Sequence, residues 1–189
     1  MSEESTPKTR TRARPKATPE TVTESQPEPA LKKEENKTLV VYATKVGATG
    51  EAANLVAETL REKNGLEVDV IDLKRQPHPD VSVYKNIVVG GGVRAGKLYK
   101  ETVDFMKQDF GGKRLAVFIC SGAAGSPFHK AEVAEKYITK GLAANPNLNV
   151  VSKEAFGGCI KIFGKAIMDR RDPAKVRAWA EEVGKKFTA

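Results

Sequence analysis

The chain has 189 residues, of which 40% are hydrophobic and 30% are charged, with a formal net charge of +8. This length and apolar content suit one folded domain around a single core rather than two folding units. No apolar run reaches the roughly 18–20 residues that a membrane-spanning helix needs, and no apolar secretory segment opens the chain, so we expect a cytoplasmic protein.

The first 36 residues differ in composition from the rest of the chain. They contain five of the ten prolines, many Ser, Thr and Glu residues, and almost no large apolar side chain. We therefore expect residues 1–36 to be a disordered tail, because such a segment buries too little surface to offset its ordering entropy. Four Lys and three Arg balance seven Glu there, so the net positive charge belongs to residues 37–189. A local basic run between Lys8 and Lys16 is most simply a solvated part of the tail, and nucleic-acid binding is not expected.

From Lys37 onward, short β-rich runs alternate with helical patterns. Residues 38–44 predict a buried strand, and residues 51–63 follow with apolar positions at helical spacings of three and four. Residues 66–73 alternate between apolar and polar positions, which predicts a second strand. A third apolar run, 86–93, includes three consecutive glycines. The helical face predicted after it is marked by Val103, Met106 and Phe110.

The second half of the chain continues the same alternation. Residues 114–122 predict a fourth strand, a helical pattern follows, and residues 148–158 predict a fifth strand. The last helix begins with Asp172 as its N-cap and Pro173 at its first helical position. Strands alternating with helices form right-handed parallel βαβ units, so the sequence predicts a five-stranded doubly wound α/β fold with helices on both faces.

In such a fold, ligands bind beyond the carboxyl ends of the strands. Glycines and small polar residues gather at three of these predicted ends, at residues 44–49, 90–97 and 121–126. Free backbone amides at the start of a helix, together with its dipole, favour phosphate. The junction at 44–49 is therefore predicted to hold a phosphate group. The two cysteines, Cys120 and Cys159, lack metal-ligand spacing and are expected to be reduced thiols in the core, with no metal site.

The phosphate compound is indicated by the loop itself. "TKVGATG" matches neither the Walker pattern nor a dinucleotide fingerprint. Instead, Thr44 and Thr49 supply hydroxyls, Gly47 permits close backbone approach, and Lys45 adds an optional charge. "VVYATKVGAT" resembles the FMN phosphate loop of flavodoxins, in which an aromatic-ended strand is followed by Ser or Thr, a small residue and Thr.

The resemblance extends over about residues 37–187. The stretch "VGGGVRAGKLYKETVDFMKQ" is similar to the flavodoxin-domain family that includes menaquinone-dependent protoporphyrinogen dehydrogenase. The likeness implies a flavodoxin-like strand order of 2-1-3-4-5 and FMN as the cofactor. It implies a phosphate loop formed by Thr44, Lys45, Val46, Gly47, Ala48 and Thr49. It implies ring-bordering walls formed by Gly91, Gly92, Val93, Arg94, Ala95 and Gly96 on one side and by Ser121, Gly122, Ala123 and Ala124 on the other.

Two departures from the family bear on function. Protoporphyrinogen dehydrogenases carry a longer aromatic and basic segment after the fifth strand, whereas this chain has only "GGCIKIFGKAIMDRR". Electron-carrying flavodoxins are strongly acidic, whereas this domain is basic. We expect a small FMN electron-transfer protein that docks with acidic surfaces of redox partner proteins. Protoporphyrinogen or quinone oxidoreduction is the alternative, and an interaction domain that has lost its cofactor is a third possibility, against which the intact phosphate loop argues.

Several aromatic and polar residues have more than one interpretation. Tyr99, Phe128 and Phe163 are candidates for stacking on the flavin, but aromatic residues near strand ends more often fill the core. Thr44 and Thr49 are alternatively helix caps. His78 and His129 have no companion ligand at a metal-binding spacing and are expected at the surface. Cationic groups at Arg94 or Lys97 would ease full reduction of a flavin.

Overall fold

The computed structural model describes residues 37–143, 145–162 and 165–189. The predicted tail, residues 1–36, and Phe163 lie outside the described residues. The described part of the chain is an α/β domain whose central sheet is parallel, apart from one short added strand. Within it, no helix is long and apolar enough to cross a membrane.

The central sheet confirms the predicted five-stranded parallel topology. Its parallel strands run in the order β2-β1-β3-β5-β6, which in chain order is 2-1-3-4-5. The β-branched and apolar runs form these strands because their side chains pack on both faces of a covered sheet. The bounds are Thr38–Ala43 (β1), Val68–Asp72 (β2), Asn86–Arg94 (β3), Arg114–Ser121 (β5) and Asn149–Gly157 (β6).

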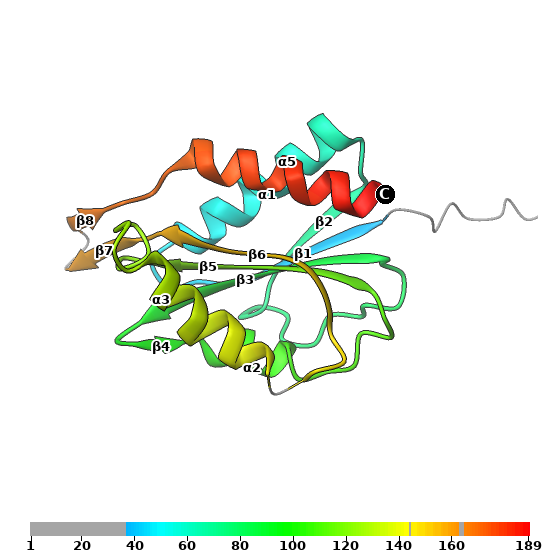
Figure 1. Ribbon diagram of the computed structural model, residues 1–189, viewed down its shortest axis with the longest axis horizontal. Helices are drawn as coiled ribbons and strands as arrows, with labels where there is room; N and C mark the ends of the chain where they lie inside the picture. The colour runs from blue at the N-terminus through cyan, green and yellow to red at the C-terminus, as the bar shows by residue number, and fades with distance from the viewer. Residues whose placement is uncertain (1–36, 144, 163–164) are drawn as a thin grey trace, which may run out of the picture. The chain divides into compact units, whose positions relative to one another are not determined.

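Helices cover both faces of the sheet, as Figure 1 shows. The helices α1 and α5 lie on one face, and α2 and α3 lie on the other. The bounds are Ala48–Asn64 (α1), Lys100–Phe105 (α2), Lys130–Ala134 (α3), Lys140–Leu142 (α4) and Pro173–Thr188 (α5). A π-helical turn, η1, covers Glu135–Thr139 between α3 and α4.

The last helix forms as its sequence predicts. Asp172 is its N-cap, and its side chain accepts a hydrogen bond from the amide of Lys175 at 3.2 Å. The residues that pack this helix on the sheet are Val176, Trp179, Ala180, Val183 and Phe187, of which all but the half-buried Trp179 are buried. Trp179 packs edge-on against Phe118 at a ring-centroid distance of 5.8 Å. This face therefore has an aromatic core beneath α5.

The third strand forms over the predicted run, glycines included. It extends to Arg94 and there pairs antiparallel with a short strand that was not predicted, β4, Lys97–Leu98. The two strands are joined by Ala95 and Gly96, both at positive φ (48° and 72°), as tight two-residue hairpins require. The stretch predicted to border the ring is thus the end of a paired strand followed by a two-residue turn.

The helical patterns on the second face are shorter than predicted. Helix α2 ends at Phe105, so Met106 and Phe110 pack into the core from the residues that follow the helix. Phe128, for which the core was the favoured position, is 89% exposed. His78 and His129 lie at the surface, as predicted.

A second hairpin follows the central sheet and was not predicted. Strands β7, Cys159–Ile162, and β8, Lys165–Asp169, pair antiparallel. At the base of the hairpin, the amide of Arg170 donates to the carbonyl oxygen of Gly158 at 3.1 Å. In Figure 1 this hairpin and β4 extend from the same end of the molecule, where the parallel strands have their carboxyl ends.

Candidate functional site

The phosphate loop predicted from the sequence opens helix α1. Gly47 is the N-cap, and its φ of 96° favours glycine. The hydroxyl oxygen of Thr44 accepts a hydrogen bond from the Gly47 amide at 3.1 Å, which shapes the loop. No side chain caps the helix, so the two threonines do not serve as its N-cap. The amides of the first turn, beginning at Ala48, therefore keep the donor capacity that every helix N-terminus has.

This helix start opens into a cavity of about 320 Å³ at the carboxyl edge of the sheet. Residues from four strand ends line it. They are Thr44, Val46, Ala48 and Thr49 after β1; Gly92, Val93, Arg94, Ala95, Gly96 and Tyr99 around the end of β3; Cys120, Ser121, Gly122 and Ala123 at the end of β5; and Gly158, Cys159 and Ile160 after β6. Tyr137, from η1, completes the lining.

One wall depends on Gly92. A Cβ at this position would lie 2.5 Å from the Tyr99 ring and 2.9 Å from the Thr49 hydroxyl oxygen. Glycine therefore lets the strand end, the aromatic ring and the phosphate-loop threonine meet. The amide of Tyr99 donates to the carbonyl oxygen of Gly92 at 3.1 Å, and the ammonium group of Lys74 lies 5.0 Å from the ring centroid. Burial raises the pKa of the Tyr99 phenol.

The opposite wall is a turn supported by the unpredicted hairpin. Ser121 closes the turn, since its hydroxyl oxygen accepts from the amide of Ala123 at 3.3 Å. A Cβ on Gly122 would lie 2.4 Å from a methyl group of Met168 and 3.1 Å from Ile160, so the hairpin packs directly on this turn. Arg170 adds a hydrogen bond to the Gly122 carbonyl oxygen at 3.1 Å. The hairpin thereby fixes the wall and adds Ile160 to the cavity.

Both cysteines are free and buried, as predicted, and both line the cavity. Burial raises the pKa of the Cys120 thiol to about 12, an effect that the neighbouring Thr49 hydroxyl only partly opposes. Cys120 is therefore a neutral thiol at physiological pH and behaves as a small apolar wall residue.

The structure brings most of the predicted site residues together. Of the sixteen, four do not line the cavity: Lys45, Gly47, Gly91 and Ala124. Lys45 is exposed, Gly47 is the N-cap that turns the chain into α1, and Ala124 is buried. A Cβ on Gly91 would meet Leu98 at 2.6 Å, so this glycine serves the packing of β4 on the other face.

Sequence reasoning missed or under-rated six lining residues. They are Tyr99, Cys120, Tyr137, Gly158, Cys159 and Ile160. The last three follow the fifth parallel strand, and the rule that ligands meet carboxyl strand ends would have included them. Tyr137 had no such signal, because it approaches from the middle of a helical segment.

The geometry suits a ligand with an anionic end and a planar body. The start of α1 with Thr44 and Thr49 lines the same cavity as the two backbone walls, whose glycines admit close approach. A family model described as "Flavodoxin domain" matches residues 39–181 of this chain. The chain belongs to the flavodoxin domain family.

A curated relative matches part of this flavodoxin domain. It is protoporphyrinogen IX dehydrogenase [quinone] of Escherichia coli K12, 32% identical over 72 residues, which are 38% of this chain and 39% of that protein. The chain therefore aligns with about two-fifths of the length of this curated relative.

Solved structures share the fold. Oxidised flavodoxin 1 from Bacillus cereus has a TM-score of 0.54 at 21% identity, covering 81% of this chain and 97% of that one. Rubredoxin oxygen:oxidoreductase from Desulfovibrio gigas has a TM-score of 0.57 at 15% identity, covering 82% and 37%. At these identities the similarity establishes the flavodoxin fold.

Proposed function

We propose that this flavodoxin-family protein binds FMN and acts as a small electron-transfer protein. The observation that carries the proposal is the shared cavity: the start of α1 opens into the same space as the walls built from the ends of β3 and β5. When bound, the flavin supplies reversible transfer of one or two electrons.

Different residues of the chain would bind the phosphate and the ring of the cofactor. The first-turn amides of α1 and the hydroxyls of Thr44 and Thr49 would bind the phosphate. The end of β3 with Tyr99 and the turn beginning at Ser121 would border the ring. Ile160, which is 41% exposed, stands at the edge of the cavity and would limit the access of water to the ring.

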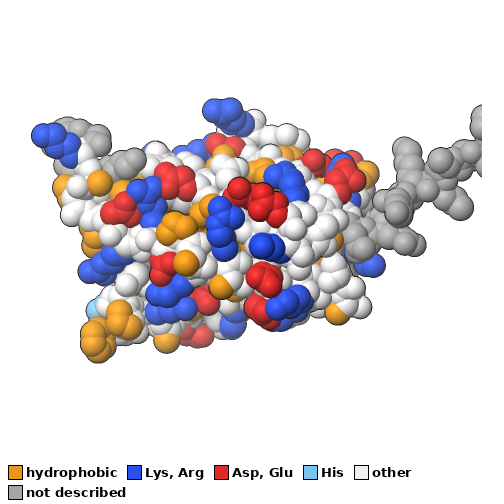
Figure 2. Space-filling view, turned by 90° about the horizontal axis from the view of Figure 1, so that it is seen from above, with side chains coloured by type: hydrophobic (Ala, Val, Ile, Leu, Met, Phe, Trp, Pro, Cys, Tyr) orange, Lys and Arg blue, Asp and Glu red, His pale blue; other side chains and the backbone are white. Residues whose placement is uncertain are grey.

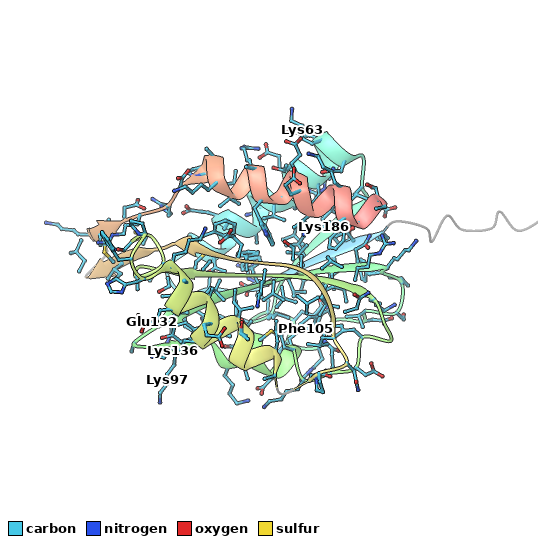
Figure 3. All side chains as sticks on the ribbon, viewed as in Figure 1. Lys63, Lys97, Phe105, Glu132, Lys136 and Lys186 are labelled. Carbon is cyan, nitrogen blue, oxygen red and sulfur yellow. The ribbon has the colours of Figure 1, made fainter. Side chains whose placement is uncertain are left out.

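The cavity edge also suits docking of a redox partner. Ile160, which lines the cavity, is 41% exposed, Ile167 of the same hairpin is 61% exposed, and Phe128, between β5 and α3, is 89% exposed. Figure 2 shows hydrophobic side chains gathered at the same end of the molecule as the hairpin. In Figure 3, Lys97 and Lys136 project outward near that end. An acidic partner with an apolar centre fits this surface, and its association should weaken as salt rises.

Protoporphyrinogen oxidation is the second candidate. The 32% identity with the E. coli enzyme over 72 residues favours it. Against it, the segment after β6 is short and forms only the hairpin β7–β8. We therefore place the electron carrier first.

Two experiments test the proposal. The purified full-length chain should show a flavin absorption spectrum, and the released cofactor should be FMN by chromatography. A colourless protein that does not bind added FMN at high concentration would refute FMN binding. A turnover assay with protoporphyrinogen IX and a menaquinone analogue then separates the two candidates, since steady porphyrin formation would favour the enzyme.

A further inference from the structure

An arginine outside the predicted site reaches the start of helix α1. Arg171 follows β8 and precedes α5, and its guanidinium donates to the Glu51 carboxylate in the first turn of α1. The same guanidinium donates to the Asp169 carboxylate, from Nε at 2.8 Å and from Nη2 at 2.5 Å. The Arg171 guanidinium thus bridges two carboxylates and links the end of β8 to the first turn of α1.

Glu51 lies beside the phosphate loop. Its amide donates to the Gly47 carbonyl oxygen at 2.9 Å, and its Oε1 lies 3.7 Å from the position of a Cβ on Gly47. Ala48 lines both the main cavity and a second cavity of about 380 Å³, which Glu51, Asp169 and Arg171 also line. The Glu51 carboxylate is therefore next to the place where the phosphate is expected.

This arrangement poses an electrostatic conflict. A carboxylate in the first turn and a bound phosphate both favour the positive end of the same helix dipole, and they repel each other. The Glu51 side chain is 52% exposed and that of Arg171 is 34% exposed, so solvent screens the repulsion only in part. A cation held on Glu51 opposes the repulsion between this carboxylate and a bound phosphate.

We propose that Arg171 neutralises Glu51 and thereby sets the preference of the pocket for phosphate-bearing FMN over riboflavin. Arg171 is a positioning residue that acts through Glu51, because its guanidinium is already engaged by two carboxylates. Its bonds to Asp169 and Glu51 also raise the pKa of the guanidinium, so the cation is permanent. The inference rests on the proposed FMN site and adds the residue pair that controls its selectivity.

The test is a set of binding measurements on the full-length chain freed of flavin. FMN and riboflavin are titrated separately, by quenching of flavin fluorescence, into the wild type, R171Q, E51Q and R171Q/E51Q. We expect R171Q to bind FMN about 5- to 20-fold more weakly, with riboflavin affinity changed by less than about twofold. The double variant should regain FMN affinity to within about threefold of the wild type, because it lacks the uncompensated carboxylate.

A second ion pair provides a matched control. Arg177 of α5 donates to Glu58 of α1 at 2.8 Å, so this is also an arginine–glutamate pair on α1, about two turns beyond Glu51. R177Q should change neither affinity, and thermal unfolding of every variant checks that it is folded.

The outcomes that contradict the inference are distinct. Equal weakening of FMN and riboflavin in R171Q would mean that Arg171 only supports the pocket wall. A double variant as weak as R171Q would mean that Arg171 contacts the phosphate itself. An unchanged R171Q in a chain that binds FMN would overturn the inference alone. A wild-type chain that binds neither flavin would overturn the proposed function together with it.

Discussion

The carbonyl oxygen of Arg170 lies 1.8 Å from the position that a Cβ on Gly157 would occupy. The end of β6 and the start of the α5 connection therefore touch backbone to backbone, with no room for a side chain. Gly158 is similarly confined, since its Cβ would lie 3.1 Å from the carbonyl carbon of Ser121. Gly157 thus lets the hairpin base lie against the end of β6, and Gly158 lets it lie against the wall formed by the turn at Ser121.

Gly157→Ala should destabilise the fold by about 3 kcal/mol or more, because a backbone clash cannot be relieved by turning a side chain. The measurement is the urea-unfolding free energy. Gly141→Ala is the control, since its Cβ would make only an ordinary contact of 3.6 Å with Met106. That helical substitution should be neutral or stabilising. Equal stability of the two variants would contradict the packing described here.

Removing the hydroxyl of Thr49, in the loop predicted to bind the phosphate, should weaken the binding of FMN more than that of riboflavin. Thr49 is 3% exposed and lines the cavity, so Thr49→Val removes a hydroxyl with little change of shape. FMN affinity should fall about 10-fold or more, which is the usual loss for a hydrogen bond to a charged group. Riboflavin affinity should change little. Parallel fluorescence titrations of both ligands check this, and an equal loss for both would place Thr49 away from the phosphate.

Arg94 is expected to tune the redox chemistry. It lines the cavity and is exposed, and a cation near the ring favours added negative charge. Arg94→Gln should make the potential of the second electron more negative by roughly 20–60 mV, corresponding to a weak, solvent-screened interaction. A potentiometric titration followed by absorbance measures the change. Lys63→Gln is a control of equal charge change, because Lys63 lies in the last turn of α1, away from the loop.

A buried tyrosine predicts how stability depends on alkaline pH. Tyr84 is 8% exposed and donates to the Asp69 carboxylate at 2.7 Å. Burial, followed by this bond, raises the pKa of Tyr84 from its ordinary value of 10.0 to about 12. The folded state therefore holds the phenolic proton more tightly than the unfolded chain. The contribution of the Tyr84 phenol to the free energy of unfolding is fully present below about pH 10. It is lost as the pH rises through the pKa of Tyr84 in the folded state.

Tyr84→Phe tests this contribution. The variant should be less stable by about 1–2 kcal/mol at neutral pH, because Asp69 loses a hydrogen-bond donor. The stability difference from the wild type should shrink between about pH 10 and 12. Urea unfolding at several pH values measures it, and a constant difference across this interval would contradict the assignment.

Sequence patterns were most informative where each element buries its own apolar face. The strand order, the N-cap Asp172 and the stripe on α5 followed from local composition and spacing, together with the family resemblance. The loop predicted to bind the phosphate begins the helix as expected, since Gly47, at φ 96°, adopts a conformation that favours glycine. These features depend on neighbours in the chain, so the sequence displays them directly.

Features that depend on distant partners were not predictable in the same way. Gly91 and Gly92 look alike in sequence, yet one packs against Leu98 and the other against Tyr99, since alternate strand positions face opposite sides. The bridge from Arg171 to Glu51 joins residues 120 positions apart. The strand β8 is short and largely exposed, so its apolar content gave too weak a signal of the hairpin.

The segment 159–169 is closed at its base by the hydrogen bond from the Arg170 amide to the Gly158 carbonyl oxygen and by the pairing of Cys159 with Asp169. Because the chain leaves and re-enters the domain at nearly the same point, a change in the length of the connection between β7 and β8 should leave α5 in place, provided that Ile160 and Met168 keep their packing on Gly122. The β7–β8 hairpin is therefore a place beside the cavity where the length of the chain can be varied. Grafting longer segments there is a direct route to altering what approaches the site while the rest of the scaffold is retained.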